Sequence, residues 1–491
     1  MMLDMVRLEA SAKLNRQRKV ELGQFLTPSS VAHFMASLFS ATSLETARLL
    51  DAGAGVGSLS AAFLDRWTSG GFSFKRVEAT AYEIDDSLRR HLARTLEGYA
   101  ARLNFGLHIQ GTDFIEDAIN QIQFHPRQRF THAILNPPYK KIGSHTRHRL
   151  LLRHVGIETV NLYSAFVALA VLLMEPHGQI VAIIPRSFCN GPYYRPFREF
   201  LLKRVALRHM HLFRARDKAF KDDAVLQENI ILFMECGGKQ GDVTISTSTD
   251  DHFADYAEHV HHFDRIVVPG DTERFIHVPT SPDRNAIDLS QTFGHSLADL
   301  GIGVSTGPVV DFRMKEHLRE MPRPGTVPLL YPGHFVGSSI EWPKSGTKKP
   351  NALVLNPDTQ KWLFPNGFYA VVRRFSSKEE RRRIVASLVT PSAFDARYLG
   401  FENHLNVFHH TKHGLPEELA RGLVVYLNST VVDEYFRRFS GHTQVNATDL
   451  RLMKYPSREM LISLGRWASR QGELTQEEID NRIRELGMMS P

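Results

Sequence analysis

The stretch LLDAGAGVGSLSAAFLDRW, residues 49–67, combines an apolar strand pattern, a glycine-rich turn and a helical pattern. Gly53, Gly55 and Gly57 occupy the turn, where residues without a side chain let the backbone approach a ligand closely. Their spacing differs from the dinucleotide fingerprint, and an ordinary βα turn uses such glycines too. The stretch therefore predicts one unit of an α/β sheet, with the turn as a candidate ligand site at the carboxyl end of its strand.

Strand and helix patterns alternate on both sides of this unit. Residues 25–39 predict an amphipathic helix with Thr27 as N-cap and Pro28 at the first helical position. Residues 161–178 predict a buried helix that ends at Gly178. Apolar strand patterns occur at residues 76–85, 106–115, 131–139, 179–188, 207–213 and 229–236. The βαβα order predicts a doubly wound, mainly parallel sheet.

The second half of the chain is polar and rich in Pro and Gly, which predicts a separate, loop-rich domain. Two helices are expected within residues 419–439, and another begins at Thr475, with Glu478 in the capping-box position. We predict a first domain over residues 1–240, a linker over 241–264, a second domain over 265–455 and a helical tail over 456–491.

Composition and charge narrow the class of protein. The 491 residues are 42% hydrophobic and carry a formal net charge of +7, with a pI near 9.3, so a polyanionic partner fits. Cys189 and Cys236 form no CxxC pair, so neither a disulfide framework nor a structural zinc site is expected. We find no signal-peptide core and no apolar run of membrane-spanning length, and therefore expect a cytoplasmic protein without a membrane partner.

Acidic residues stand at the ends of three successive predicted strands. Asp51 ends the first, where a carboxylate repels a pyrophosphate but suits an ammonium group. Glu83 ends the next, where a carboxylate can accept hydrogen bonds from both hydroxyls of a ribose. Asp113 and Phe114 follow the third and offer an acceptor for an exocyclic amine and a face for a flat ring. Each residue alone is as readily a solvated strand end, so the prediction depends on their order.

The fourth strand ends in the loop Asn136-Pro137-Pro138-Tyr139. Proline fixes its own φ and disfavours a helical conformation in the residue before it, so the loop leaves the strand in a rigid, extended form. The glycine turn, the ribose acid, the acid with an aromatic neighbour and this loop all stand at strand ends. Together they predict an S-adenosylmethionine pocket beside a site for a nucleophile.

These motifs resemble those of the DNA amino-methyltransferases whose catalytic half precedes the target-recognition half. GQFLTPSS (residues 23–30) looks like the family's N-terminal cofactor motif, LLDAGAGVG (49–57) its glycine motif and ILNPPY (134–139) its catalytic motif. The resemblance is close over about residues 15–235 and looser over residues 422–456, which are similar to the end of a recognition domain. It implies an S-adenosylmethionine-dependent methyltransferase fold, Rossmann-like with a doubly wound seven-stranded sheet, followed by an α+β target-recognition domain.

The resemblance also implies a reaction: a gamma-class enzyme of a restriction-modification system transfers a methyl group from S-adenosylmethionine to N6 of a flipped-out adenine in double-stranded DNA. In this family's pattern, Asn136 and the carbonyl of Pro137 accept the two hydrogens of the amine, Pro138 stiffens the loop and Tyr139 stacks on the flipped base. Phe220 is the candidate for the other side of that base, with a core Phe as the alternative. The implied cofactor-binding residues are Gln24, Phe25, Thr27, Pro28, Asp51, Ala52, Gly53, Gly55, Gly57, Glu83, Ile84, Asp113, Phe114 and Asn136.

Basic clusters supply candidate DNA contacts. The candidates for phosphate contacts are Lys140, Lys141, Arg147 and Arg149, directly after the catalytic loop, with a solvated charge run as the alternative. In the second half the candidates are Arg373, Arg374 and Arg382, together with Arg381, Arg383, Lys344, Lys348 and Lys349. The histidine clusters HVHHF and HHTKH lack accompanying ligands, so no metal site is expected and none is needed for methyl transfer.

Other classes of protein share parts of this pattern. NPPY also occurs in methyltransferases that act on protein glutamine or on guanine in ribosomal RNA, although such enzymes are typically shorter. N4-cytosine enzymes usually have Ser or Asp where Asn136 stands, which favours adenine. A fused enzyme that also cuts DNA and a non-catalytic DNA-binding subunit are further alternatives, but we find no nuclease motif and all four pocket motifs are intact.

The expected partners are duplex DNA and, functionally, a cognate restriction endonuclease. We expect a monomer or weak dimer associated with the bacterial nucleoid, and a short palindromic target, for which CTGCAG is a guess. Neither cysteine lies in a Pro-Cys motif, so we expect direct displacement without a covalent enzyme–base intermediate.

Overall fold

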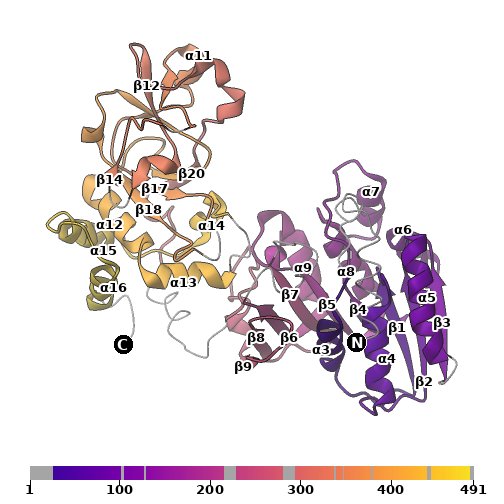
Figure 1. Cartoon of the computed structure of the whole chain (residues 1–491). Helices are drawn as coiled ribbons and strands as arrows, with labels where there is room; N and C mark the ends of the chain where they lie inside the picture. Colours follow the sequence, from indigo (N-terminus) through magenta and orange to yellow (C-terminus); the bar gives the residue numbers. More distant parts are fainter. Residues whose placement is uncertain are drawn as a thin grey trace. The chain divides into compact units, whose positions relative to one another are not determined.

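The computed structural model describes residues 26–100, 104–125, 129–214, 228–279, 293–336, 339–346, 348–376, 380–439 and 444–486. The chain divides into two compact units, Met1–Pro282 and Asp283–Pro491, each of which has its own sheets and core (Figure 1). We call them unit 1 and unit 2.

Unit 1 is built on one sheet with the strand order β3-β2-β1-β4-β5-β7-β6-β8-β9. The strands are β1 (Thr46–Ala52), β2 (Arg76–Tyr82), β3 (Phe105–Gln110), β4 (Phe130–Leu135), β5 (Met174–Pro185), β6 (Val205–Phe213), β7 (Asn229–Cys236), β8 (Val243–Ser248) and β9 (Ala257–His261). The first five in the sheet order are parallel, and β7 is antiparallel to both β5 and β6. The strand order reverses between β1 and β4, which is where doubly wound sheets hold their ligands.

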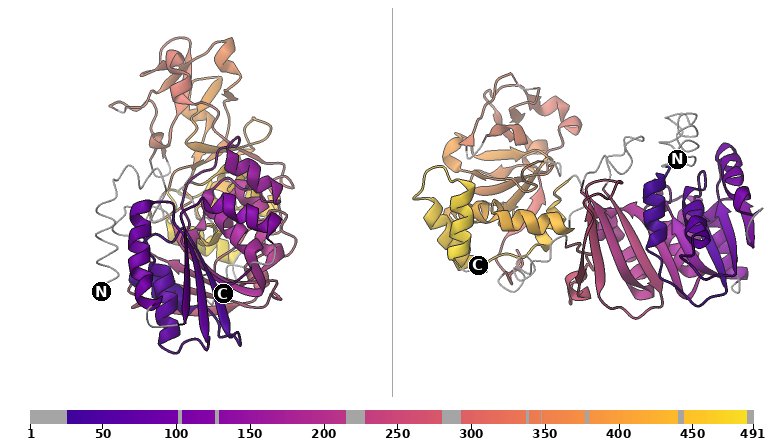
Figure 2. Two further views of the ribbon diagram at one scale, coloured as in Figure 1. Left: turned by 90° about the vertical axis from the view of Figure 1, so that its right-hand side faces the viewer. Right: turned by 60° about the horizontal axis from the view of Figure 1, so that its bottom comes forward.

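Helices cover both faces of this sheet (Figure 2, left). The first core contains α3 (Ser29–Ser37), α4 (Ser58–Thr68) and α5 (Asp86–Ala100). The second contains α6 (Phe114–Phe124), α7 (Arg147–His154), α8 (Leu162–Leu173) and α9 (Arg195–Arg204). The predicted doubly wound, Rossmann-like α/β fold is confirmed.

Three details of unit 1 differ from the prediction. The segment 241–264, predicted as a linker, instead contributes β8 and β9, so the described residues form a sheet of nine strands rather than seven. The helix expected over residues 161–178 ends at Leu173, because Pro176 disfavours helical backbone in the residue before it and β5 already begins at Met174. Helix α3 begins at Ser29, so Pro28 rather than Thr27 is its N-cap.

Unit 2 is an α+β unit, as predicted for the second half. Its four-stranded antiparallel sheet has the order β10 (Gly303–Thr306), β20 (Leu405–His409), β17 (Tyr369–Arg373) and β18 (Ala386–Val389). Its five-stranded sheet has the order β11 (Leu318–Arg319), β15 (Ala352–Val354), β12 (Thr326–Leu330), β19 (Tyr398–Phe401) and β16 (Phe364–Pro365). A third sheet pairs β13 (Phe335–Val336) with β14 (Ser339–Ile340).

The helices of unit 2 are α11 (Pro357–Gln360), α12 (Glu417–Leu427), α13 (Thr430–Phe439), α14 (Ala447–Leu452), α15 (Arg458–Ala468) and α16 (Gln476–Glu485). Helices α12 and α15 touch through their backbones: a Cβ atom added to Gly422 would lie 1.7 Å from the carbonyl oxygen of Leu461. The described part of the predicted tail, residues 456–486, is therefore packed into unit 2. The capping box of Thr475 and Glu478 is confirmed. No helix among the described residues is long and apolar enough to cross a membrane.

Candidate active site

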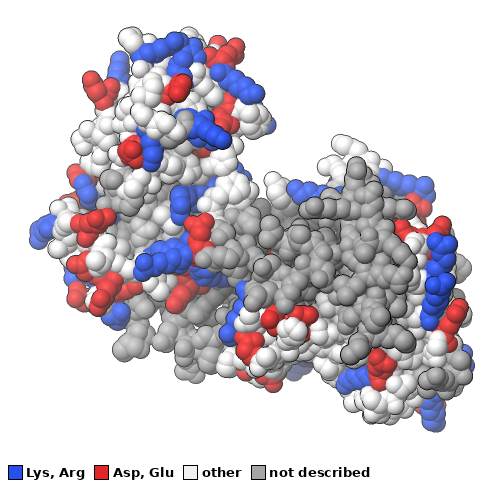
Figure 3. Space-filling model, viewed as in Figure 1, with Lys and Arg blue, Asp and Glu red and all other residues white. Residues whose placement is uncertain are grey.

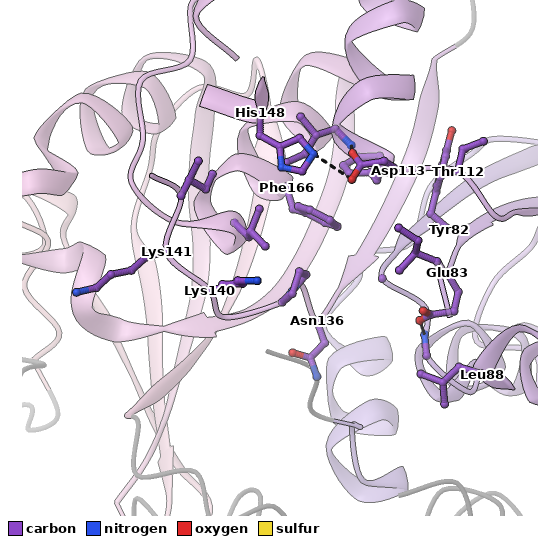
Figure 4. A pocket seen from close by; sticks show the side chains of 18 of the residues that line it. Tyr82, Glu83, Leu88, Thr112, Asp113, Asn136, Lys140, Lys141, His148 and Phe166 are labelled. Carbon is purple, nitrogen blue, oxygen red and sulfur yellow. Dashed lines mark hydrogen bonds and ion pairs between the residues drawn. The ribbon is translucent and has the colours of Figure 1, made fainter. Parts of the chain in front are cut away.

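A cavity of about 340 Å³ lies in unit 1, where β1 to β4 end (Figure 4). The predicted site residues that line it are Gly53, Gly55, Glu83, Ile84, Asp113, Phe114, Asn136, Pro138, Lys140 and Lys141. Residues from four strand ends, far apart in the sequence, therefore meet at one site. Its size and concavity suit a small-molecule ligand.

The glycine turn shapes one wall of the cavity. Gly53, Gly55 and Gly57 have φ angles of +83°, +57° and +88°, a region that strains any residue with a side chain. The amides of Gly53 and Ala54 donate to the carbonyl oxygen of Tyr82, at 3.0 and 2.9 Å, and fasten the turn to the end of β2. A Cβ atom on Gly53 would lie 3.6 Å from the carbonyl oxygen of Asn136, so the backbone of the glycine turn passes close to the backbone of the NPPY loop.

Glu83 is buried and held in one orientation. The amide of Gly55 donates to Oε2 at 2.9 Å, and the amide of Asp85 donates to Oε1 at 2.8 Å. Burial raises the pKa of Glu83, although these two hydrogen bonds oppose the shift. Glu83 thus presents a carboxyl group of fixed orientation to the cavity.

Asp51 lies beneath the turn and does not line the cavity. Its side chain is fully buried, and Ser60 Oγ donates to Oδ2 at 2.6 Å. Oδ1 is buried with no hydrogen-bond partner among the residues that the structure describes. Burial raises the pKa of Asp51 to about 7, despite the Ser60 bond, and the charge of Glu83 adds to the shift. Ala52 and Gly57 also lie outside the cavity wall.

Asp113 has two roles at the start of α6. Its Oδ1 accepts hydrogen bonds from the amides of Ile115 and Glu116, at 2.9 and 3.1 Å, and so caps the helix. Its Oδ2 lies 3.1 Å from Nε2 of His148, a residue that no sequence motif had singled out (Figure 4). Burial alone raises the pKa of Asp113, but the His148 bond and the two amides outweigh it and lower the pKa overall.

Apolar side chains complete the part of the cavity near Phe114. The Phe114 ring lies 5.0 Å from the Tyr82 ring and 4.9 Å from the Phe166 ring, centroid to centroid. Phe166 and Leu162 come from α8, and Ile142 comes from the segment after NPPY. Sequence reasoning missed Leu162 and Phe166 because apolar residues in a buried helix look like ordinary core.

The side chain of Asn136 is oriented at both ends. Its Nδ2 donates to Thr27 Oγ1 at 2.9 Å, and its Oδ1 accepts from the Tyr139 hydroxyl at 3.2 Å. That hydroxyl also lies 3.3 Å from the carbonyl oxygen of Ile183, and burial raises the pKa of Tyr139. Tyr139 thus points inward, edge-on to Tyr163, rather than lining the cavity. Thr27, Pro28 and Pro137 also lie outside the wall.

The basic residues after the loop divide into two groups. Lys140 and Lys141 are exposed, line the cavity, and form no ion pair within the described ranges (Figure 4). Arg147 is exposed and pairs with Glu116 at 3.0 Å. Arg149 is buried and paired with Glu158. The predicted phosphate contact of Arg149 is therefore wrong, because its guanidinium already neutralises a carboxylate inside the protein.

The arginines of unit 2 that were predicted to contact DNA also include both partly exposed residues and residues held inside the protein. Arg373 and Glu380 form a partly exposed pair at 3.0 Å, and Arg374 donates to the carbonyl oxygen of Asn403. Arg382 donates to backbone carbonyls, including that of Ser429 at 2.8 Å, and Arg383 is buried. The DNA contact predicted for Arg382 is therefore wrong, because the N–H groups of its guanidinium already donate to carbonyl oxygens within unit 2.

Lysines of unit 2 are partly engaged as well. Lys344 pairs with Glu341 and Lys349 with Asp311, each at 2.7 Å. In the view of Figure 3, the basic side chains of this unit are interspersed with acidic ones rather than gathered in one patch.

Some predictions fall outside the described residues, namely those for Gln24, Phe25 and Phe220. Within the described part of the chain, no group of three His, Cys, Asp or Glu residues is arranged to hold a metal ion.

Comparison with known proteins places this chain in a family. The family model of the Eco57I restriction-modification methylase matches residues 73–220. The Type II methyltransferase M.BsuBI of Bacillus subtilis is 55% identical over 477 residues, 96% of this chain and 95% of that protein. The Type II methyltransferase M.PstI of Providencia stuartii is 43% identical over 492 residues, 98% of this chain and 96% of that protein.

Among solved structures, a chain in a cryo-EM structure of a DrdV–DNA complex has a similar fold, with a TM-score of 0.50 and 12% identity over 91% of this chain and 57% of that chain. The two Type II relatives match nearly the whole chain, both units included. The chain belongs to the Type II methyltransferases of restriction-modification systems.

Proposed function

We propose that the protein transfers a methyl group from S-adenosylmethionine to N6 of an adenine flipped out of duplex DNA. One observation carries the proposal: Asn136 of the NPPY loop lines the same cavity as the glycine turn, Glu83 and Asp113. A group that can activate an amine therefore adjoins groups that suit an adenosyl ligand.

The cavity fits this cofactor in several respects. Glu83 lines the cavity with its side chain oriented by two backbone amides, and a carboxylate is the kind of group that accepts hydrogen bonds from ribose hydroxyls. Phe114 and Phe166 give an apolar wall for a flat base. Asp51 lies outside the cavity wall, but its buried Oδ1 has no hydrogen-bond partner among the described residues and is the proposed acceptor for the cofactor's ammonium group. The bound cofactor would supply an electrophilic methyl group.

Asn136 is suited to activate the target amine. Because its Nδ2 is held by Thr27, its Oδ1 has a defined direction and can accept one hydrogen of the amine. The carbonyl of Pro137 would accept the other, which draws the nitrogen toward tetrahedral geometry and stabilises positive charge as it develops. Such acceptors are effective only when held still, which is the contribution of the two prolines. The target amine would replace the Tyr139 hydroxyl at Oδ1.

The target base must leave the duplex to reach Asn136, at a cost of a few kcal/mol. Tyr139 is the proposed stacking partner, and Phe220 remains the candidate for the opposite face. Lys140, Lys141 and Arg147 are proposed to bind phosphates near the flipped nucleotide. Unit 2 would recognise the DNA sequence, and Arg373 and Arg374 are proposed to contact DNA bases or the DNA backbone. Methylation would protect the site from a cognate endonuclease.

The test is transfer of tritium from labelled S-adenosylmethionine to plasmid DNA, to RNA and to protein, followed by nucleoside analysis and sequencing of modified adenines. We expect N6-methyladenine at one short sequence. Asn136→Ala should abolish transfer and leave cofactor affinity nearly unchanged, because Asn136 would face the amine and not the sulfonium. Asn104→Ala, on an exposed residue next to β3, should leave transfer unchanged. Label in RNA or protein alone, or full activity of Asn136→Ala, would refute the proposal.

A further inference from the structure

His148 connects two parts of the site that are separate in sequence. Its Nε2 lies 3.1 Å from Oδ2 of Asp113, and its ring lines the cavity (Figure 4). The preceding residue, Arg147, pairs with Glu116. The first turn of α7 is therefore attached to the start of α6 by a histidine–carboxylate contact and an ion pair.

The hydrogen bonds of Asp113 leave room for one more donor. Its Oδ1 accepts from two backbone amides, which use both of its lone pairs. Its Oδ2 accepts from His148 and retains one lone pair. Since Asp113 lines the cavity, a ligand amine can share Oδ2 with His148.

The segment between the catalytic loop and His148 forms a cavity wall. Lys140, Ile142 and Thr146 all line the cavity. They belong to the segment 140–146, which runs from Tyr139 to the start of α7. The contact between His148 and Asp113 closes this wall against α6. His148 therefore joins two parts of the site. It belongs to the wall that continues from the NPPY loop, and it holds Asp113, the residue proposed to bind the adenine of the cofactor.

We propose that His148 is a cofactor-positioning residue, which fixes the Asp113 carboxylate so that its remaining lone pair accepts the exocyclic amine of the cofactor's adenine. This inference rests on the proposed function, because it requires an adenosyl ligand in the cavity.

The charges around His148 give the contact a pH dependence. Asp113 and Glu116 face it from α6, and Arg147 adjoins it on α7. The hydrogen bond to Asp113 raises the pKa of His148, against burial and the charge of Arg147. An imidazolium donates a stronger hydrogen bond to a carboxylate than a neutral ring does. Affinity for an adenosyl ligand should therefore fall as the pH rises and His148 loses its proton.

The test compares two ligands by calorimetry on the full chain: S-adenosylhomocysteine, and S-inosylhomocysteine, in which a carbonyl oxygen replaces the amine. Wild type should prefer the adenosyl ligand. His148→Ala should weaken the adenosyl ligand about tenfold, the loss expected for one charge-assisted hydrogen bond, and reduce the preference. His148→Gln, whose amide can also donate to Oδ2, should keep the preference but lose the pH dependence.

Two variants serve as controls for attachment of the wall. His154→Ala alters an exposed histidine at the other end of α7 and should change neither affinity. Arg147→Ala removes the neighbouring ion pair and should affect both ligands equally, if at all. Equal weakening of both ligands by His148→Ala would overturn the inference alone. Failure of wild type to bind S-adenosylhomocysteine would overturn the proposed function and this inference with it.

Discussion

Replacing Asp51 by Asn should weaken cofactor binding and, as the pH rises, increase the free energy of unfolding relative to wild type. Burial raises the pKa of Asp51 from its ordinary value of 3.8 to about 7, so the folded protein keeps a proton that the unfolded chain loses. Between those values the folded state binds more protons, and stability falls as the pH rises. At about 1.36 kcal/mol per pH unit, the full cost of ionising Asp51 is roughly 4 kcal/mol above pH 7.

An Asn at this position cannot ionise, and its oxygen can still accept from Ser60. Its buried NH2 group costs about 1–3 kcal/mol if it finds no acceptor, a term that does not change with pH. Relative to wild type, Asp51→Asn should therefore gain roughly 2 kcal/mol in the free energy of unfolding between pH 5.5 and pH 8. Urea denaturation at the two pH values measures this gain, with Asp242→Asn as the control at an exposed position.

Ligand binding tests the other half of the prediction. Asp51→Asn should weaken binding of S-adenosylmethionine at least about tenfold, because the ammonium group would lose the carboxylate proposed as its partner. The affinity for 5′-methylthioadenosine, which has no ammonium group, should not change. A stability difference that does not vary with pH, or equal losses for both ligands, would show that Asp51 supports the turn rather than the cofactor.

Four other outcomes follow from the structure. Thr27→Val should lower kcat about tenfold with little change in cofactor affinity, because Asn136 loses the acceptor that orients it; an unchanged kcat would contradict this. Replacing Cys189 and Cys236 by Ser should spare methyl transfer, and neither native thiol should react with a thiol reagent at pH 8, since burial raises the pKa of each to about 12. Lys141→Ala should weaken binding to all DNA sequences alike and reduce the salt slope by about 1; a sequence-dependent loss would argue for base contact. Arg373→Ala should relax discrimination at one base pair by ~1–3 kcal/mol, measured by competition between single-base variants of the site, and a uniform loss would identify a phosphate contact instead.

The sequence alone determined the strands of unit 1 from β1 to β7 and the order of the motifs around its cavity, but not β8 and β9. Strand and helix periodicity are local properties, and the carboxyl ends of parallel strands meet at one edge of a sheet. Gly53, Glu83, Asp113 and Asn136 could therefore be assigned to one site although more than 80 residues separate the first from the last.

Only the tertiary structure decided which side chains are available to a ligand. Arg149, Arg382 and Lys140 all lie in runs of basic residues and were all predicted to contact DNA. In the folded protein Arg149 pairs with a carboxylate and Arg382 with backbone carbonyls, whereas Lys140 stays exposed. His148 meets Asp113 because α7 packs against α6, a contact between residues 35 positions apart that no local pattern encodes. Burial of Asp51 likewise depends on elements around it, and burial is what raises its pKa. Periodicity fixes which face of an element is apolar, whereas the charge state and partners of a polar group are set by what packs against it.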